Sequence, residues 1–376
     1  MNLNFLKNYS KILINLRWMD KNKIHPIINW YYLQIRQFCR QNNIKLVFLN
    51  EWNKWIYSEA INKTIFSKIK NFLLSNATLF LPTINKIPSK KWELIITDNQ
   101  FLITNWDYIV FLDWVHSFTG YNAKWLYNPY MKYLIRYFIS RPNLKYLIIA
   151  TKTWLQSIIN YLWKDFYEKY KNKFIVEYPK LLIDKNYLEK LKSKRKENLK
   201  KQNYKSFLFI WKDFIRKWWI ETIIAIYELY KEWKINTNTH KFTFITKKIE
   251  IPNFILKKYK ELEKQWIIKH FEPQFKTEEI YEKFYTTHKV FLLPTRWDPF
   301  WMVFLEAKAF DMEVITTDQW PAREIFEGYD KVKFIEFIEG KNKWHKKNNI
   351  PKYNTTKLLL DFNNLLNIDQ IKNFIK

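Results

Sequence analysis

Short apolar runs alternate with longer amphipathic segments along this chain of 376 residues. In the first half the apolar runs predict strands at 11–16, 44–49, 77–82, 92–97, 108–113, 146–151 and 173–178. Helical spacing predicts helices between several of them, notably at 26–41, 124–139 and 152–162. This alternation is typical of parallel strands that are joined by helices.

The same alternation restarts after a charged stretch. Strands are predicted at 206–211, 241–246, 266–271, 289–294 and 313–318, and helices at 218–232, 252–264, 276–286 and from 301 onward. Residues 184–206 are rich in charge and poor in large aliphatic side chains, which favours a linker or a solvated helix. Parallel strands place ligands at their carboxyl ends, so two such halves facing each other would form one cleft.

The predicted architecture is therefore α/β, with two Rossmann-like domains facing each other across a cleft. We assign residues 1–184 to the N-terminal domain, 185–205 to a linker and 206–340 to the C-terminal domain. Residues 341–376 are expected to form a C-terminal helical segment that packs across the domains.

The use of tryptophan and glycine is unusual. The chain has 19 Trp and 3 Gly, whereas glycine normally makes up about 7% of a globular protein. Many of the tryptophans fall in predicted turns, where glycine has a mechanical role. Our hypothesis is that most of them are glycine in the organism, because its code would read UGA as Gly where this translation of the gene has Trp. The alternative is a protein that is truly rich in tryptophan.

The formal net charge of +28 would suggest nucleic acid or an anionic membrane as a partner. Only nine of the 64 basic residues are arginine, however, and Lys, Asn, Ile, Tyr and Phe are all abundant, as an AT-rich gene produces. Charge alone is therefore weak support for either partner. It is compatible with anionic substrates or anionic lipid surfaces.

Cysteine use and hydropathy bear on the cellular location. The single cysteine, Cys39, excludes an internal disulfide and fits a reducing cytosol. No apolar run reaches the ~18 residues needed to span a bilayer, and the N-terminus lacks the pattern of a cleaved signal. We expect a cytoplasmic protein, with peripheral contact at the inner face of the membrane as an option.

Two segments carry candidate binding chemistry. In "FLFIWKDFIRKWW" (207–219), Lys212 and Lys217 bracket the start of a helix, a placement that suits a diphosphate. In "PTRWDPFWMVFLEAKAF" (294–310), the carboxylates of Asp298 and Glu306 follow a strand and can accept hydrogen bonds from sugar and ribose hydroxyls. Ordinary surface lysines, a capping aspartate and a solvated glutamate are the simpler explanations.

Together these segments resemble glycosyltransferase family 4, the retaining nucleotide-sugar transferases with the GT-B fold. The family has Pro-Ser/Thr, an acidic residue, Pro-Phe-Gly, seven residues between two glutamates, and then a glycine turn ahead of a Glu-Ile pair. The matching residues here are Pro294, Thr295, Asp298, Pro299, Phe300, Trp301 in place of Gly, Glu306, Trp320 in place of Gly, and Glu324. The resemblance is strong over 205–330 and weaker over 1–200.

The resemblance implies roles for six of the candidate residues. Glu306 would hold the ribose hydroxyls, and Asp298, where the family more often has glutamate, would contact the donor sugar. Lys217 matches the diphosphate lysine, and Lys212 replaces an arginine and so gives a point charge rather than a bidentate fork. The backbone N–H groups of Trp301 and Met302 would bind the diphosphate.

In the N-terminal half, "FLDWVHSFTG" (111–120) places His116 just beyond a strand, where family members often carry a histidine that faces the donor sugar. A structural or solvated histidine is the alternative. By the same resemblance the N-terminal domain would bind the acceptor and the C-terminal domain the nucleotide sugar.

The implied activity is hexosyl transfer from a nucleotide-diphosphate sugar to a glycan or lipid-linked acceptor, with retention of anomeric configuration. Neither a metal nor a cofactor is expected, and the lysines and a helix N-terminus would stabilise the leaving diphosphate.

Within the same class, a soluble enzyme making a storage or osmolyte glycoside is the alternative. From another class, the chain could be a non-catalytic basic module that binds nucleic acid or anionic lipid. No RNA-binding signature is found, so we expect no nucleic acid partner.

Overall fold

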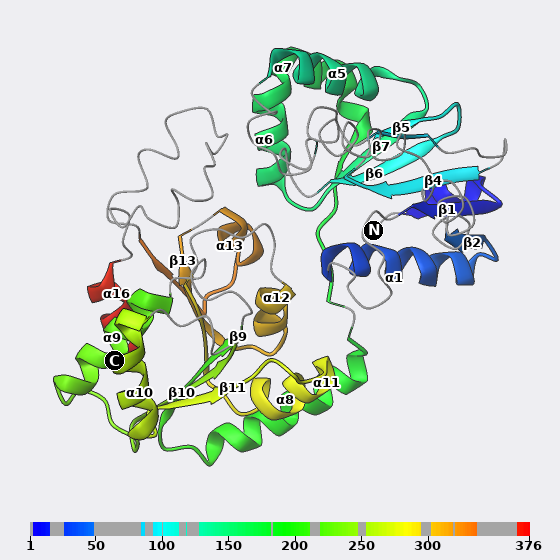
Figure 1. The fold of residues 1–376 in the computed structure, drawn as a ribbon. Helices are drawn as coiled ribbons and strands as arrows, with labels where there is room; N and C mark the ends of the chain where they lie inside the picture. Colours follow the sequence, from blue (N-terminus) through cyan, green and yellow to red (C-terminus); the bar gives the residue numbers. More distant parts are fainter. Residues whose placement is uncertain are drawn as a thin grey trace, which may run out of the picture. The chain divides into compact units, whose positions relative to one another are not determined.

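The computed structural model describes residues 3–15, 26–48, 84–86, 93–99, 101–112, 118, 128–181, 183–210, 219–246, 253–294, 302–318, 320–336 and 367–376. The chain forms two compact units, the first ending at Lys180 and the second beginning at Leu181. Each unit is built on its own parallel sheet (Figure 1).

The sheet of the first unit has the strand order β2-β1-β4-β6-β7-β8. Its strands are β1 (Lys11–Asn15), β2 (Lys45–Phe48), β4 (Glu93–Asp98), β6 (Tyr108–Leu112), β7 (Leu144–Ile149) and β8 (Phe174–Val176). Its α-helices are α1 (Pro26–Gln41), α5 (Pro129–Ser140), α6 (Lys152–Leu162) and α7 (Lys164–Tyr170), with 3-10 helices η1 (Leu3–Asn8) and η3 (Lys171–Lys173). Strands β3 (Ile84–Lys86) and β5 (Phe101–Ile103) pair separately, and the sequence did not predict them.

The sheet of the second unit has the strand order β11-β10-β9-β12-β13-β14. Its strands are β9 (Lys205–Ile210), β10 (His240–Ile245), β11 (Ile268–Phe271), β12 (Val290–Leu293), β13 (Glu313–Thr317) and β14 (Val332–Ile335). Its helices are α8 (Lys185–Lys200), α9 (Trp219–Lys231), α10 (Asn253–Lys264), α11 (Thr277–Ile280), the π-helix η6 (Tyr281–Tyr285), α12 (Met302–Ala309), α13 (Trp320–Ile325) and α16 (Ile368–Ile375).

Both sheets are entirely parallel, and every pairing between their strands confirms this. In the second unit, helices α9, α10 and α16 lie on one side of the sheet and α8, α11 and α12 on the other (Figure 1). The central strands β9 and β12 are buried almost throughout, as parallel strands covered on both faces must be. The prediction of two Rossmann-like α/β units is confirmed.

The charged stretch after the first unit forms helix α8, and this helix belongs to the second unit. Arg195 is only 6% exposed. With Asn198 and Gln202 it donates hydrogen bonds to successive backbone carbonyl groups of residues 285–289. Arg195 Nη1 lies 3.0 Å from the carbonyl oxygen of Tyr285, and Arg195 Nη2 lies 3.3 Å from the carbonyl oxygen of Lys289. Asn198 Nδ2 lies 3.2 Å from the carbonyl oxygen of Thr286. Gln202 Nε2 lies 2.6 Å from the carbonyl oxygen of Thr287. Arg195 Nη1 also donates to the oxygen of His288.

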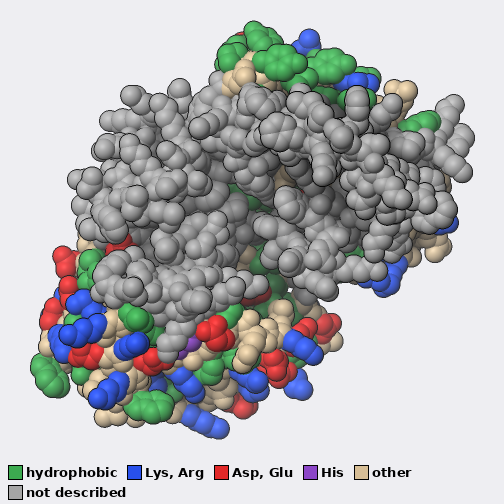
Figure 2. All heavy atoms as spheres, viewed as in Figure 1, with side chains coloured by type: hydrophobic (Ala, Val, Ile, Leu, Met, Phe, Trp, Pro, Cys, Tyr) green, Lys and Arg blue, Asp and Glu red, His purple; other side chains and the backbone are tan. Residues whose placement is uncertain are grey.

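The surface of the second unit mixes charges of both signs on the face shown in Figure 2. Lysine and arginine side chains alternate there with aspartate and glutamate, so this face is not a uniform basic patch. In the part of the chain that the structure describes, no helix is long and apolar enough to cross a membrane.

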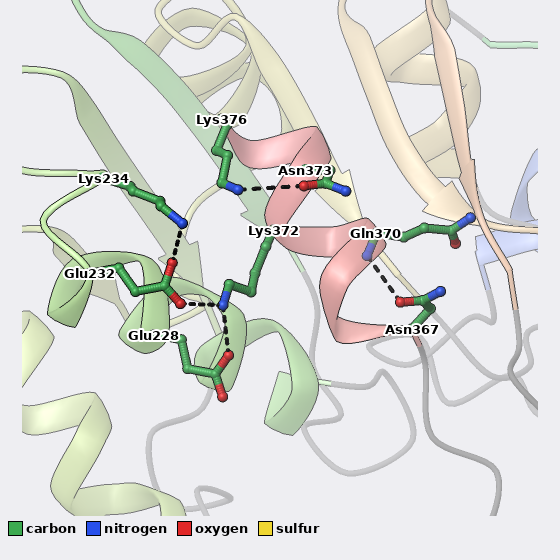
Figure 3. Close-up of polar contacts among 8 residues, drawn as sticks. All are labelled: Glu228, Glu232, Lys234, Asn367, Gln370, Lys372, Asn373 and Lys376. Atoms are coloured by element: carbon green, nitrogen blue, oxygen red, sulfur yellow. Dashed lines mark hydrogen bonds and ion pairs between the residues drawn. The ribbon is translucent and has the colours of Figure 1, made fainter.

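Helix α16 at the C-terminus docks on the second unit (Figure 3). Lys372 Nζ lies 3.0 Å from a carboxylate oxygen of Glu228 and 2.5 Å from one of Glu232, both on or just beyond α9. Ile371 and Ile375 on the same helix are fully buried. The salt bridges are solvated on their acidic side, so the apolar burial supplies most of the docking energy.

His288 is a buried pH-sensitive group of the second unit. Its Nδ1 lies 2.8 Å from the carbonyl oxygen of Phe284, and its Nε2 lies 2.7 Å from Thr243 Oγ1. Burial lowers the pKa of His288 from 6.5 to about 4. The folded chain therefore keeps this ring neutral, whereas the unfolded chain takes up a proton as the pH falls below 6.5.

We therefore predict that His288 makes the protein less stable in mild acid. As the pH falls from 6.5 to about 4, the free energy of unfolding should drop by up to about 3 kcal/mol on account of this residue. Urea unfolding at pH 7, 6 and 5 would measure it. His288→Gln should show a shallower dependence on pH, and equal slopes in both proteins would contradict the assignment.

Candidate functional site

The switch point of the second sheet marks the candidate site. Strands β9, β10 and β11 follow each other in one direction across the sheet, and β12, β13 and β14 follow in the other. The reversal falls between β9, which ends at Ile210, and β12, which ends at Leu293. In open parallel sheets, ligands bind outside the carboxyl ends of the strands at such a point.

Most of the predicted site residues lie outside the described residues. These are Lys212 and Lys217 after β9, Asp298 and Trp301 after β12, and His116 in the first unit. Their proposed roles stay predictions. The structure describes Glu306 and Met302, and both lie on α12, the helix that follows β12.

Helix α12 forms because its apolar positions recur on one face. Phe304 and Ala307 are fully buried, as is Phe310 just beyond the helix. The helix ends where Asp311 takes φ 57° and the N–H of Met312 bonds to the carbonyl of Ala307 at 3.0 Å. At the other end, the helix begins at Met302, and the first backbone N–H groups of a helix have no partner within it. A negative ligand group is favoured there.

Glu306 is held by two tyrosines of the π-helix η6. Tyr281 Oη donates to Glu306 Oε1 at 3.0 Å, and Tyr285 Oη donates to Glu306 Oε2 at 2.7 Å. Tyr285 is fully buried and Tyr281 is 6% exposed, while Glu306 itself is half-buried. Each carboxylate oxygen therefore has one fixed donor and retains a lone pair for a further one.

The electrostatics of this cluster follow from burial. Burial raises the pKa of Glu306, and the hydrogen bonds from Tyr285 and Tyr281 oppose that rise. Burial also raises the pKa of both tyrosines, with a further contribution from the nearby carboxylate. The two phenols thus stay protonated and act only as donors to Glu306.

The sequence analysis missed Tyr281 and Tyr285. A signal was present, because the two tyrosines are four residues apart in a segment predicted to be helical. The structure adds that this segment is a π-helix, a form that often occurs at functional sites.

A second carboxylate lies at the end of β13. Asp318 Oδ2 accepts from Arg323 Nη2 at 2.8 Å, and Arg323 Nε also donates to Asp318 Oδ1. Thr316 Oγ1 donates to the carbonyl of Leu293 at 2.9 Å and ties β13 to the end of β12. The Arg323–Asp318 contact ties α13 to the end of β13, and the sequence motif continues along this helix to Glu324. Among the described residues, no group of three His, Cys, Asp or Glu side chains could hold a metal ion.

Comparison with known proteins bears on the fold. No family model matches the chain, and no curated protein matches its sequence. The structure is similar to that of a glycosyltransferase from Rickettsia africae, with a TM-score of 0.51 and 12% identity over 97% of this chain and 90% of that one. The lipopolysaccharide glycosyltransferase WaaG gives a TM-score of 0.49 and 12% identity over 97% and 95% of the two chains.

A UDP-forming trehalose-phosphate synthase from Burkholderia xenovorans gives a TM-score of 0.47 and 10% identity, over 87% of this chain and 88% of that one. At these identities the likeness concerns the fold alone. The two parallel sheets with their helices, and the likeness to the Rickettsia africae glycosyltransferase, confirm the predicted α/β fold, GT-B with two Rossmann-like domains.

Proposed function

We propose that this protein is a glycosyltransferase that takes a sugar from a nucleotide-diphosphate donor. The observation that carries the proposal is the placement of Glu306, a carboxylate held by two buried phenols on the helix that follows β12 at the switch point. The family 4 resemblance of 294–310 assigns this position to ribose binding, and the glycosyltransferase fold supports the same reading.

In the proposed mechanism the ribose 2′- and 3′-hydroxyls donate to the Glu306 carboxylate. Lys212, Lys217 and the N–H groups at Trp301 and Met302 neutralise the diphosphate as the bond to the sugar breaks, so no metal is needed. Asp298 and His116 contact the donor sugar, and a glycan or lipid-linked acceptor takes the sugar with retention. The configuration of the product, determined by NMR, tests retention.

We predict that the donor nucleotide binds without a metal ion, in a buffer that contains a chelator. UDP or GDP should bind saturably, in isothermal titration calorimetry, to the wild-type protein, meaning the protein as its source organism makes it. Glu306→Gln should weaken that binding by about 30-fold or more, because a neutral amide replaces the acceptor of two charge-assisted hydrogen bonds. Lys217→Ala should also weaken it.

The matched control is Glu261→Gln. Glu261 also accepts from a tyrosine and a lysine, Tyr227 at 2.9 Å and Lys231 at 2.5 Å, but it lies on α10. The Glu261→Gln substitution should leave the affinity for the nucleotide unchanged. If no nucleoside diphosphate binds, while the chain retards nucleic acid or binds lipid in a salt-sensitive way, the non-catalytic alternative stands instead.

We also propose that most of the tryptophans are glycine in the native protein. Trp163, Trp233 and Trp266 have φ of 73°, 56° and 57°, a region that disfavours any residue with a Cβ. After α9, Trp233 N–H bonds to Tyr230 O and Lys234 N–H to Leu229 O at 3.0 and 2.9 Å. This is the Schellman pattern, whose left-handed position usually holds glycine.

The side chains support the same reading. Trp163, Trp233 and Trp266 are 53%, 88% and 76% exposed, so none of them is retained by burial in a core. The alternative of a truly tryptophan-rich protein leaves most of the Trp233 and Trp266 side chains in solvent. The Trp163 ring, by contrast, contacts two cations, with Lys132 Nζ 3.8 Å and the guanidinium carbon of Arg136 3.9 Å from its centroid.

The test is mass spectrometry of the protein from its source organism. The tryptic peptide 297–308 should carry glycine at 297 and 301, because the family motif needs a backbone that approaches the phosphates closely. Tryptophan at both positions, or nucleotide-dependent transfer by the chain exactly as written, would contradict the recoding proposal.

Peripheral contact with an anionic membrane is a further part of the proposal, and helix α5 supports it. Tyr130, Tyr133 and Tyr137 are 63%, 65% and 55% exposed and recur on one face of the helix. Residues 129–140 include no acidic side chain, and the guanidinium of Arg141 lies 5.8 Å from the ring of Tyr137. Hydrophobic and basic side chains gather at the top of Figure 2, where α5 lies in Figure 1.

Tyrosine is favoured at the headgroup level of bilayers, and basic side chains are drawn to anionic lipid. We predict that the protein sediments with vesicles containing phosphatidylserine and less with neutral ones. Changing Tyr130, Tyr133 and Tyr137 together to Ser should lower the bound fraction several-fold. The control is the pair Leu33→Ser and Ile103→Ser, which removes exposed apolar side chains elsewhere. Equal binding of both variants would exclude α5 as the contact.

A further inference from the structure

We infer that Tyr281 and Tyr285 are positioning residues, which fix the Glu306 carboxylate so that it recognises the vicinal diol of the donor ribose. The inference rests on the proposed function and assigns two residues that lie outside the family motif. Its basis is geometric, because both carboxylate oxygens are engaged, each by a different phenol, at 3.0 and 2.7 Å.

The two phenols leave the carboxylate little freedom to rotate. A single donor would allow the group to turn about its Cγ–Cδ bond, whereas two donors on different oxygens fix its plane. A planar carboxylate in a fixed orientation keeps one lone pair on each oxygen for a further donor. That arrangement matches two adjacent hydroxyls, which are the 2′- and 3′-hydroxyls of a ribose.

The tyrosines are themselves fixed by their surroundings. The Tyr285 ring lies 5.0 Å from that of Phe310 and 6.1 Å from that of Phe291, measured between centroids. The Tyr281 ring lies 5.4 Å from the Phe310 ring. Phe291 belongs to β12 and Phe310 follows α12, so the two tyrosines, the strand and the helix form one packed cluster.

A second layer of contacts holds the π-helix that carries them. Arg195 of α8 donates a hydrogen bond to the carbonyl of Tyr285 at 3.0 Å. Asn198 and Gln202 donate to the next two carbonyls, those of Thr286 and Thr287. The carbonyl of Tyr281 accepts from the N–H of Thr286 at 3.3 Å, the bond that defines the π turn. Arg195, Asn198 and Gln202 thus help to set the position of both phenols through the backbone of residues 285–287.

The experiment compares a ribonucleotide with its dideoxy analogue. The wild-type protein should bind UDP, or GDP where that binds better, more tightly than the 2′,3′-dideoxy form of the same nucleotide. Tyr285→Phe should weaken binding of the ribonucleotide about tenfold, in line with the loss of one hydrogen bond to a charged group, and leave the dideoxy form within about twofold. Tyr281→Phe should act in the same direction.

In transfer assays both variants should raise KM for the donor with kcat little changed, because the ribose lies away from the reacting carbon and is bound equally in the ground and transition states. Tyr227→Phe is the matched control. It removes a tyrosine hydroxyl that donates to the Glu261 carboxylate at 2.9 Å on the other side of the sheet and should change neither affinity.

The outcomes separate the inference from the proposed function. If the wild-type protein binds the ribonucleotide and discriminates against the dideoxy form, while both Phe variants discriminate equally well, the tyrosines are not positioning residues and the glycosyltransferase proposal survives. A loss of affinity for both nucleotides alike would show general damage to the fold and would also overturn the inference. If no nucleoside diphosphate binds to the wild-type protein, both proposals fail together.

Discussion

The parallel pairing of β9 with β12 is the constraint on which the second unit depends. Phe207 and Leu208 of β9 lie beside Val290 and Phe291 of β12, although the strands are more than eighty residues apart. Once these strands pair, the intervening units β10 and β11 must add on one side, and β13 and β14 on the other. In open parallel sheets, ligands bind at the carboxyl ends of the strands where such a reversal falls.

The hydrogen bonds around Glu306 offset the free-energy cost of removing its carboxylate from water. A carboxylate that is partly removed from water loses solvation, and only well-placed donors offset that loss. Glu306 has such donors in Tyr281 and Tyr285, and their helix is paired in turn by Arg195. An apolar residue at 306 would avoid this cost, and the presence of a carboxylate there supports the binding role that we propose for it.

How far the sequence predicts this structure depends on the range of the forces involved. The strands at β9, β12 and β13 were predicted to within about a residue, because each is an apolar run whose burial is evident from its own composition. Strands β3 and β5 were missed, since three-residue strands carry too little periodicity. Helix α8 was read as a linker or solvated helix, because the partners of Arg195 lie some ninety residues away along the chain.

In the candidate site, too, the features set by local sequence were predicted and those set by long-range packing were not. The motif made Glu306 visible, since it occurs at a fixed spacing within one short segment. The role of the tyrosines was not visible, because it depends on how η6, which precedes β12 in the chain, packs against α12, which follows it.

Two of the tryptophans, Trp233 and Trp266, stand at helix ends with left-handed backbone. A helix that ends in the left-handed conformation needs a residue that tolerates φ > 0, and in this protein Asn43 and Asp311 occupy such ends with φ of 55° and 57°. Both residue types are known to tolerate that conformation. Trp233 and Trp266 occupy equivalent ends with φ of 56° and 57°, where a bulky residue costs about 1–2 kcal/mol.

The fold keeps these ends because each is fixed by hydrogen bonds within the backbone and not by the side chain. Their side chains meet solvent instead of a core. A position that demands glycine for its backbone and offers nothing to a large side chain is hard to reconcile with selection for tryptophan. The physical argument for recoding is therefore independent of the family motif, and it applies at sites far from the proposed nucleotide pocket.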